Sequence, residues 1–249
     1  MRRKRSRYFP VLLAALALAV ALARTRQARP HVPPRPRVDT RVLFIGNSYT
    51  FFNDGLDKAL ARLVPRVAAE RVAAGGATLK VHWEHDEAHQ AIRRGNWDYV
   101  VLQEQSQTPV INRQLFAEYA ARFDQEIRHA GAHTVLLMTW ERPDSVRYGV
   151  TTANLAAAYD AVGGALGAPV APAGLAFAAA RRAHPEQLLY QPDGHPTAPG
   201  TLLAACVVAE TIGLRRDILG DGQLAAEQMA YFLGLADGAR RANGMPARP

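Results

Sequence analysis

Cysteine is almost absent from this chain. Cys206 is the single cysteine among 249 residues, so a disulfide within the chain is impossible. It lies in an apolar run at residues 202–208, and we expect it to be a buried helical residue without chemistry. Aromatic residues are also few, at 8%, whereas 49% of the residues are hydrophobic. This composition and length suit one globular domain with a well-buried core.

Most of the chain also lacks an excess of positive charge. The formal net charge is +8, but ten of the thirty Lys and Arg residues lie within residues 1–40, where Asp39 is the only acidic residue. Residues 41–249 contain twenty basic and twenty-one acidic residues. A nearly neutral domain offers no phosphate-binding face, so we expect no nucleic-acid partner.

A comfortably long membrane span is missing from the N-terminus. The apolar run Val11 to Ala23 follows a basic cluster and is short for a transmembrane helix. It ends in Ala21-Leu22-Ala23, with small residues where a signal peptidase requires them. Residues 1–23 are therefore expected to be a cleaved signal peptide, or alternatively an N-terminal anchor that tethers the protein to the membrane. Either would place the domain outside the cytoplasm, secreted or membrane-anchored.

The remaining chain divides into a linker and a domain. Residues 24–39 hold four prolines among basic residues, which predicts an extended, disordered linker.

In residues 40–249, apolar runs alternate with helical patterns, which predicts a parallel sheet. Most of these runs are continuously apolar, so helices should cover both faces of the sheet. We therefore predict an α/β fold, a three-layer α/β/α sandwich with a central parallel sheet of about five strands, as in flavodoxin-like proteins. The expected strands are 42–45, 79–83, 99–102, 134–138 and 169–171, and the expected helices are 54–64, 87–94, 113–129, 152–166, 197–212 and 224–241.

Unusual polar residues follow several of the predicted strands, where ligands bind in such sheets. They lie at 46–48, 103–107 and 140–142, and a further polar segment at 193–197 precedes a helix. Ser48 sits on a strand-to-helix turn that can expose a hydroxyl as a nucleophile, although such a serine can also be a simple helix cap. His195 is a candidate general base, with a surface loop residue as the alternative.

Three segments resemble the sequence blocks of SGNH/GDSL-like hydrolases, which are esterases. FIGNSYT at 44–50 resembles the first block, in a variant with Asn47 where Asp usually precedes the nucleophile. The segment 97–103 resembles the strand that leads into the third block, and 190–200 resembles the last block. The resemblance spans about residues 40–215 and implies Ser48 as nucleophile, His195 as base and Asp193 as the residue that orients His195. One residue separates Asp193 from His195, whereas the family usually has two, which leaves the role of Asp193 open.

The same resemblance implies an oxyanion hole, a set of donors for the negative oxygen of the tetrahedral intermediate. Two donors would be the backbone N–H groups of Ser48 and of Gly76, which lies just before the second predicted strand. Gly75 could take the place of Gly76 as the donor. Alternatively, both glycines form a plain turn with no role in catalysis. The third-block Asn is missing, and Gln103 or Gln105 is the candidate replacement in this Gln-rich loop because a primary amide can make the same contact.

Other polar and aromatic residues near these motifs are candidates for binding. Asn47, Tyr49 and Trp140 are expected to contact substrate, although the two aromatic residues could equally be packing residues. The cluster His82, His85, Asp86 and His89 has two histidines one helical turn apart, but it lacks the pattern of a zinc helix. We expect a solvated face there, with no metal and no cofactor.

The predicted function is that of a serine esterase whose substrate is a small-molecule or carbohydrate ester. An extracytoplasmic location and the Gln-rich loop favour O-acetyl groups on carbohydrate, by analogy with relatives. Two alternatives stay open: a noncatalytic protein that binds carbohydrate or a surface, and an O-acyltransferase acting on envelope polysaccharide. The oligomeric state is open too.

Overall fold

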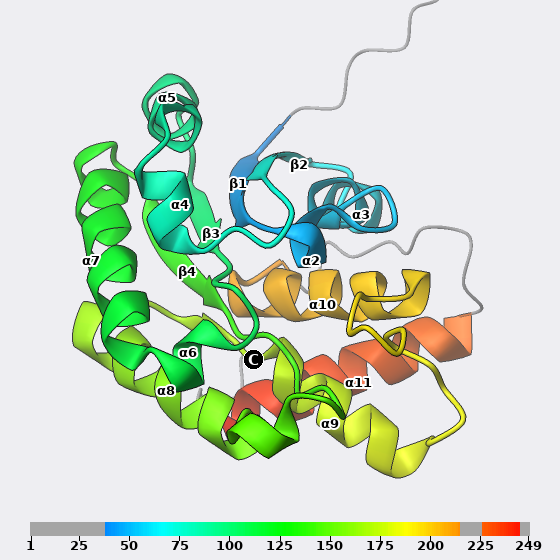
Figure 1. Ribbon diagram of the computed structural model, residues 1–249. Helices are drawn as coiled ribbons and strands as arrows, with labels where there is room; N and C mark the ends of the chain where they lie inside the picture. Colours follow the sequence, from blue (N-terminus) through cyan, green and yellow to red (C-terminus); the bar gives the residue numbers. More distant parts are fainter. Residues whose placement is uncertain (1–37, 215–225, 245–249) are drawn as a thin grey trace, which may run out of the picture. The chain divides into compact units, whose positions relative to one another are not determined.

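Five parallel strands form a single sheet with helices on both faces (Figure 1). The computed structural model describes residues 38–214 and 226–244, so the predicted signal or anchor segment and nearly all of the predicted linker lie outside the described residues. The strand order is β2-β1-β3-β4-β5, and all neighbouring strands pair in parallel. The strands are β1 (Thr40–Gly46), β2 (Val67–Ala73), β3 (Tyr99–Leu102), β4 (His133–Leu137) and β5 (Val170–Ala171). The predicted three-layer α/β/α fold with about five strands is confirmed.

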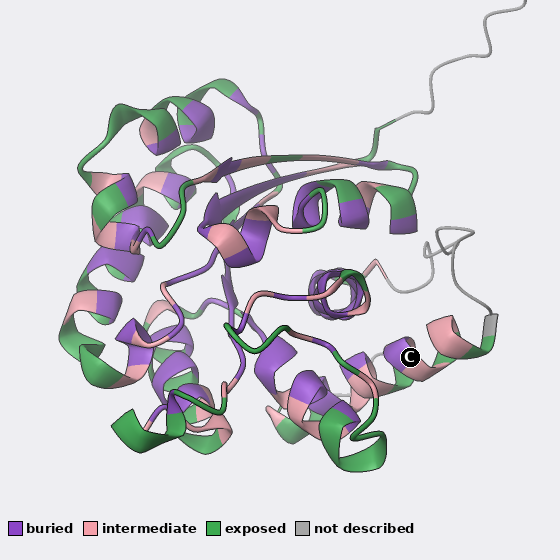
Figure 2. Ribbon diagram, turned by 45° about the vertical axis from the view of Figure 1, so that its right-hand side comes forward, coloured by how far each residue is buried: buried purple, intermediate pink, exposed green. Residues whose placement is uncertain are grey.

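Each face of the sheet has its own hydrophobic core, because successive strand residues point to opposite faces. Phe44 belongs to the core beneath one helical layer, whereas its neighbours Leu43 and Ile45 belong to the core beneath the other. The first layer contains α3 (Leu56–Leu63), α9 (Ala173–Ala183), α10 (Ala198–Thr211) and α11 (Ala226–Ala242). The second contains α4 (Leu79–Trp83), α5 (Asp86–Arg94), α7 (Arg113–His129) and α8 (Thr152–Leu166). Figure 2 shows buried residues concentrated on the strands and exposed residues on the outer helical surfaces. Cys206 is fully buried in α10, as expected.

One predicted strand is wrong. Residues 79–83 form the short helix α4, because Thr78 caps it by accepting a hydrogen bond from the Val81 N–H at 3.2 Å. The second strand is instead β2, which carries Glu70 and Arg71 because it lies at the edge of the sheet and is only partly covered. Gly75 and Gly76 therefore follow this strand, whereas the sequence placed them just before it. That change moves Gly76 to the carboxyl edge of the sheet.

The predicted helices are present wherever the structure describes them, and α7 and α8 have the predicted bounds. The Ala-rich helix α9 was not predicted. Two one-turn helices, α2 (Ser48–Phe51) and α6 (Thr108–Ile111), follow β1 and β3. Within residues 38–214 and 226–244, no helix is long and apolar enough to cross a membrane.

Candidate active site

The turn after β1 places Ser48 at the start of α2. Asn47 is the N-cap of this helix, and its Oδ1 accepts the Tyr49 N–H at 3.1 Å. Its Nδ2 donates to the Ala77 carbonyl at 3.1 Å, so the Asn47 side chain ties the Ser48 turn to the loop that carries Gly76. Ser48 itself is partly exposed, and as the first residue of the helix it has no helical acceptor for its N–H.

Only glycine fits at position 46, directly before this turn, because other side chains approach its backbone closely. A Cβ on Gly46 would lie 2.3 Å from Thr50 Oγ1 and 2.6 Å from Gln103 Oε1, well inside van der Waals contact. The Gly46 carbonyl accepts a hydrogen bond from His82 Nε2 at 2.6 Å. Burial lowers the pKa of His82, so this imidazole is a neutral donor that supports the turn. Among the residues described, no group of three His, Cys, Asp or Glu side chains is arranged to hold a metal ion.

Ser48, His195 and Asp193 form one hydrogen-bonded chain although Ser48 and His195 are 147 residues apart. Ser48 Oγ lies 2.9 Å from His195 Nε2, and His195 Nδ1 lies 2.9 Å from Asp193 Oδ2. Asp193 Oδ1 also accepts the His195 backbone N–H at 3.0 Å. These bonds to His195 lower the pKa of Asp193, so it stays a carboxylate and can only accept. Nδ1 of His195 must therefore carry a proton, which leaves Nε2 to accept the proton of Ser48.

The tight turn between Asp193 and His195 depends on glycine. Gly194 has φ +88°, a conformation that side chains with a Cβ rarely adopt. An added Cβ would also lie 2.0 Å from Cδ of Arg142 and 2.5 Å from the Tyr49 hydroxyl. This conformation lets a carboxylate two positions before the histidine turn back onto Nδ1, which explains how the short spacing still makes the contact.

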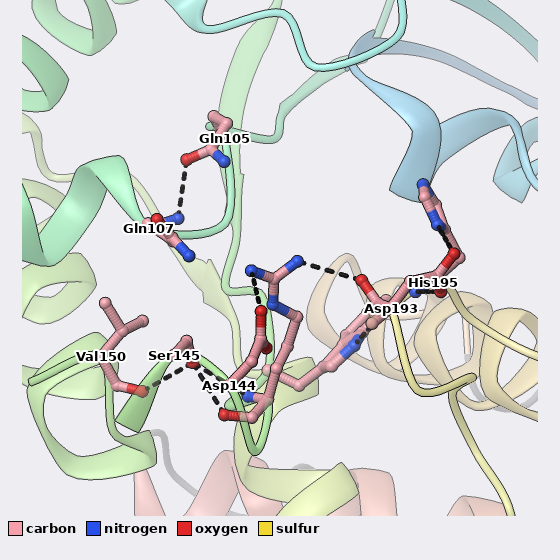
Figure 3. Close-up of polar contacts among 10 residues, drawn as sticks. Gln105, Gln107, Asp144, Ser145, Val150, Asp193 and His195 are labelled. Atoms are coloured by element: carbon pink, nitrogen blue, oxygen red, sulfur yellow. Dashed lines mark hydrogen bonds and ion pairs between the residues drawn. The ribbon is translucent and has the colours of Figure 1, made fainter. Parts of the chain in front are cut away.

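Three side chains from elsewhere in the sequence hold the His195 loop through its backbone carbonyls. Trp140 Nε1 donates to the Gly194 carbonyl at 3.0 Å, and Arg142 Nη1 donates to the Asp193 carbonyl at 3.0 Å. Arg142 also pairs with Asp144 at 3.2 Å (Figure 3). Asn53 Nδ2 donates to the Pro196 carbonyl at 2.8 Å. Neither Arg142 nor Asn53 had an individual role in the sequence-based prediction; the only signal was the position of Arg142 after a predicted strand.

Aromatic rings hold the His195 imidazole in place. Phe52 stacks on it with ring centroids 4.1 Å apart and 12° between the planes, and Tyr49 meets it edge-on at 5.8 Å. Tyr49 in turn stacks on Trp140 at 4.6 Å, and Trp140 stacks on Phe177 at 4.1 Å. Burial raises the pKa of Tyr49. Tyr49 and Trp140 are almost fully buried, so their observed contacts are those of supporting residues. Their contact with substrate, like that of the buried Asn47, stays a prediction.

The two candidate glutamines have different surroundings. Gln103 is buried, and its Oε1 accepts from the Asn47 N–H at 3.0 Å and from Thr50 Oγ1 at 2.9 Å. Its Nε2 donates to the Glu104 carbonyl at 2.6 Å, so the amide is already used inside the protein. Gln105 Oε1 accepts from the N–H groups of Gln107 and Thr108 at 2.8 and 3.2 Å, and Figure 3 shows its nitrogen on the side away from Gln107. Within the described chain, Gln105 Nε2 has no acceptor.

Gly76 resembles Gln105 in offering an open donor. It follows β2, has φ +69°, and an added Cβ would meet nothing within 4 Å. Its N–H donates to no acceptor among the residues that the structure describes, and no helical carbonyl is available to the N–H of Ser48. These three donors follow β1, β2 and β3 at the carboxyl edge of one sheet, which makes them candidates for an oxyanion hole.

Solved structures similar to this chain include proteins described as SGNH hydrolases and as an esterase. A protein from Slackia heliotrinireducens assigned to the SGNH hydrolases is 31% identical, with a TM-score of 0.62 over 70% of this chain and 99% of that one. A DUF4886 family protein from Bacteroides uniformis is 14% identical, with a TM-score of 0.63 over 84% of this chain and 97% of that one. A catalytic mutant of an acetylxylan esterase from Geobacillus stearothermophilus is 15% identical, with a TM-score of 0.51 over 72% of this chain and 96% of that one. No protein-family model and no curated protein matches the chain.

The fold and these similarities define an α/β/α hydrolase. More narrowly, the chain belongs to the SGNH/GDSL-like hydrolase superfamily, which confirms the resemblance found in the sequence.

Proposed function

We propose that this protein is a serine esterase that hydrolyses its substrate through an acyl-enzyme on Ser48. The observation that carries the proposal is the continuous hydrogen-bonded chain from Ser48 Oγ through the His195 imidazole to the Asp193 carboxylate. A hydroxyl becomes a competent nucleophile when a neighbouring base can take its proton and a third group orients that base.

The proposed reaction has two halves. In the first, His195 Nε2 takes the Ser48 proton as Oγ attacks the ester carbonyl, and the N–H groups of Ser48 and Gly76 with Gln105 Nε2 stabilise the oxyanion. The His195 imidazolium then donates its proton to the leaving alcohol. In the second half His195 activates a water that attacks the acyl-enzyme, and the proton returns to Ser48 as the acid is released. Asp193 orients His195 and stabilises its cationic form throughout.

The proposed substrate class is an O-acetylated carbohydrate. The Gln-rich third loop and the fold shared with an acetylxylan esterase support this choice. An acyltransferase acting on envelope polysaccharide would use the same residues but deliver the acyl group to a sugar hydroxyl. A noncatalytic binding protein is disfavoured, because the short Asp193-to-His195 spacing that supported it nevertheless makes a hydrogen bond.

An aryl acetate assay on the purified protein tests the proposal. Release of the aryl alcohol, together with stoichiometric labelling of Ser48 by a serine-directed phosphonate, would support it. Labelling of another residue would identify a different nucleophile, and absence of both reactions would favour the binding protein. An acceptor sugar added to the same assay would yield an acylated sugar only from an acyltransferase.

We propose further that the domain works outside the cytoplasm, after cleavage behind Ala23. The basic cluster, the apolar run and the small residues before this point support it. Mass spectrometry of the protein recovered from its native host should find the mature N-terminus after Ala23. Retention of the first residues in a membrane fraction would instead indicate the anchor.

A further inference from the structure

A second carboxylate lies in the loops around the proposed site but outside the Ser48–His195–Asp193 chain. Glu104 is the second residue after β3, and its side chain is completely buried. A charged group is costly to bury without partners, so the contacts that Glu104 makes need an explanation. The fully buried Tyr159 of α8 interacts electrostatically with it.

The partners of Glu104 are backbone N–H groups from two separate loops. Both carboxylate oxygens lie 3.3 Å from the Leu79 N–H, at the start of α4 and three residues after Gly76. Oε1 also accepts the Gln105 N–H at 2.6 Å. One side chain therefore joins the loop after β2 to the loop after β3.

Each joined loop carries one of the proposed oxyanion donors. Gly76 lies on the first loop, whose Ala77 carbonyl is already fixed by Asn47. Gln105 lies on the second, and its backbone N–H is the atom bound by Glu104. A developing oxyanion is stabilised only if its donors stay within a few tenths of an ångström of their required positions, so the separation of these loops matters for the rate.

We infer that Glu104 is a positioning residue that fixes the Gly76 and Gln105 donors relative to each other by accepting hydrogen bonds from both loops. The inference rests on the proposed function for its effect on the rate, but the tie between the loops is a property of the fold. It requires an acceptor oxygen at Glu104 and does not require a negative charge.

Two substitutions of similar size separate these requirements in an aryl acetate assay. Glu104→Leu removes both acceptor oxygens and should lower kcat about thirty-fold with KM changed by less than about two-fold, because the lost alignment matters most in the transition state. Glu104→Gln keeps one oxygen within reach of both N–H groups and should retain kcat within about three-fold. Equal losses in the two variants would overturn the inference. If the Leu variant does not fold, Glu104→Asp, which shortens the reach, should also lower kcat, and full activity would contradict the tie.

A double-mutant cycle shows whether Glu104 acts through Gln105. Glu104→Leu should cost much less in a Gln105→Ala background than in the wild type, since the donor that it positions is already gone. The same fold-loss in both backgrounds would show a general structural effect and overturn the inference. Asp124→Asn is the matched control: it removes another mostly buried carboxylate, paired with Arg128 within α7, and should leave kcat unchanged.

Amide hydrogen exchange separates this inference from the proposed function. If the wild-type protein hydrolyses no ester, the proposed function fails, yet the tie can still be measured. Exchange at Leu79 and Gln105 should be slow in the wild type and in Glu104→Gln, and at least about ten-fold faster in Glu104→Leu. Unchanged protection of both amides in Glu104→Leu would show that Glu104 does not hold the two loops together.

Discussion

Asp193 and His195 are separated by a single glycine, yet Asp193 Oδ2 lies 2.9 Å from His195 Nδ1. The carboxylate reaches the imidazole because the left-handed Gly194 reverses the chain between them. A contact usually made across a longer spacing is thus achieved by a tighter turn. Asp193 is also largely exposed, with 60% of its side chain accessible.

We predict that Asp193→Asn lowers kcat/KM for an aryl acetate by about a hundred-fold while leaving the fold intact. The amide cannot stabilise the His195 cation and can favour the wrong tautomer. We expect the loss to be smaller than the roughly 10⁴-fold effect of removing a buried triad carboxylate, because water can partly replace an exposed one. Steady-state kinetics and circular dichroism of the variant check this. A nearly silent substitution would mean that His195 works without Asp193.

Gly194→Ala should impair both stability and turnover. The positive φ alone should cost roughly 1–2 kcal/mol, and the added Cβ would press on Arg142 and Tyr49 and displace His195. Gly131→Ala is the matched control, because Gly131 has φ +81° but open space around it, away from the site. Urea unfolding should show destabilisation in both variants, whereas kcat should fall only in Gly194→Ala. Equal kcat values in the two variants would contradict the role given to this turn.

Substitution of Gln105 should mainly lower the rate of hydrolysis, whereas substitution of Gln103 should mainly lower the stability of the fold. Gln105→Ala should lower kcat by about two to three orders of magnitude with little change in KM, as expected for a lost oxyanion donor. Its cost in stability should be the smaller of the two, because water can replace the acceptor of the half-buried Gln107 N–H. Gln103→Ala should instead reduce the free energy of unfolding by about 1–3 kcal/mol, because the buried Asn47 N–H and Thr50 hydroxyl lose their acceptor. Kinetics and urea unfolding of both variants test this. A large, purely kinetic effect of Gln103→Ala would reverse the assignment.

Sequence patterns predicted most of this fold because they report local geometry. The helix α7 begins after Asn112, whose side chain caps it, and α8 begins after the capping Thr151, so both helices carry their own start signals. The edge strand β2 has no such signal: its charged residues and alanines do not form an apolar run. Residues 79–83 alternate as a strand would, but burial of Leu79 and His82 on one side favours a helical turn.

The candidate site could be predicted only as far as its motifs extend. Ser48 and His195 stand in recognisable segments, but the choice between Gln103 and Gln105 depends on which way each amide turns. That orientation is set by Asn47 and Thr50 for Gln103, more than fifty residues away in the sequence. The bonds from Asn53 and Arg142 to the His195 loop likewise join distant segments, and no local pattern encodes them.

The buried Glu104 should make stability depend on pH. Burial raises its pKa from an ordinary 4.5 to about 7. The folded protein then holds this proton more tightly than the unfolded chain, so the contribution of Glu104 is favourable at low pH and is lost as pH rises from about 4.5 to about 7. Over this range the free energy of unfolding should fall by about 3 kcal/mol. It should be absent in Glu104→Gln.

Urea unfolding of the wild type and Glu104→Gln at about pH 5 and about pH 8 measures this effect. The wild type should lose stability relative to the variant at the higher pH. A constant difference in the free energy of unfolding between the two proteins would show that Glu104 does not titrate in this range.

Turnover of an aryl acetate by Ser48→Ala tests the central claim most directly. The substitution removes only the Oγ that lies 2.9 Å from His195 Nε2, so thermal unfolding should match the wild type. If Ser48 forms the acyl-enzyme, hydrolysis should fall by about three or more orders of magnitude. A folded Ser48→Ala variant that keeps more than about a tenth of the wild-type rate would contradict the account, because losing a true serine nucleophile costs far more than that.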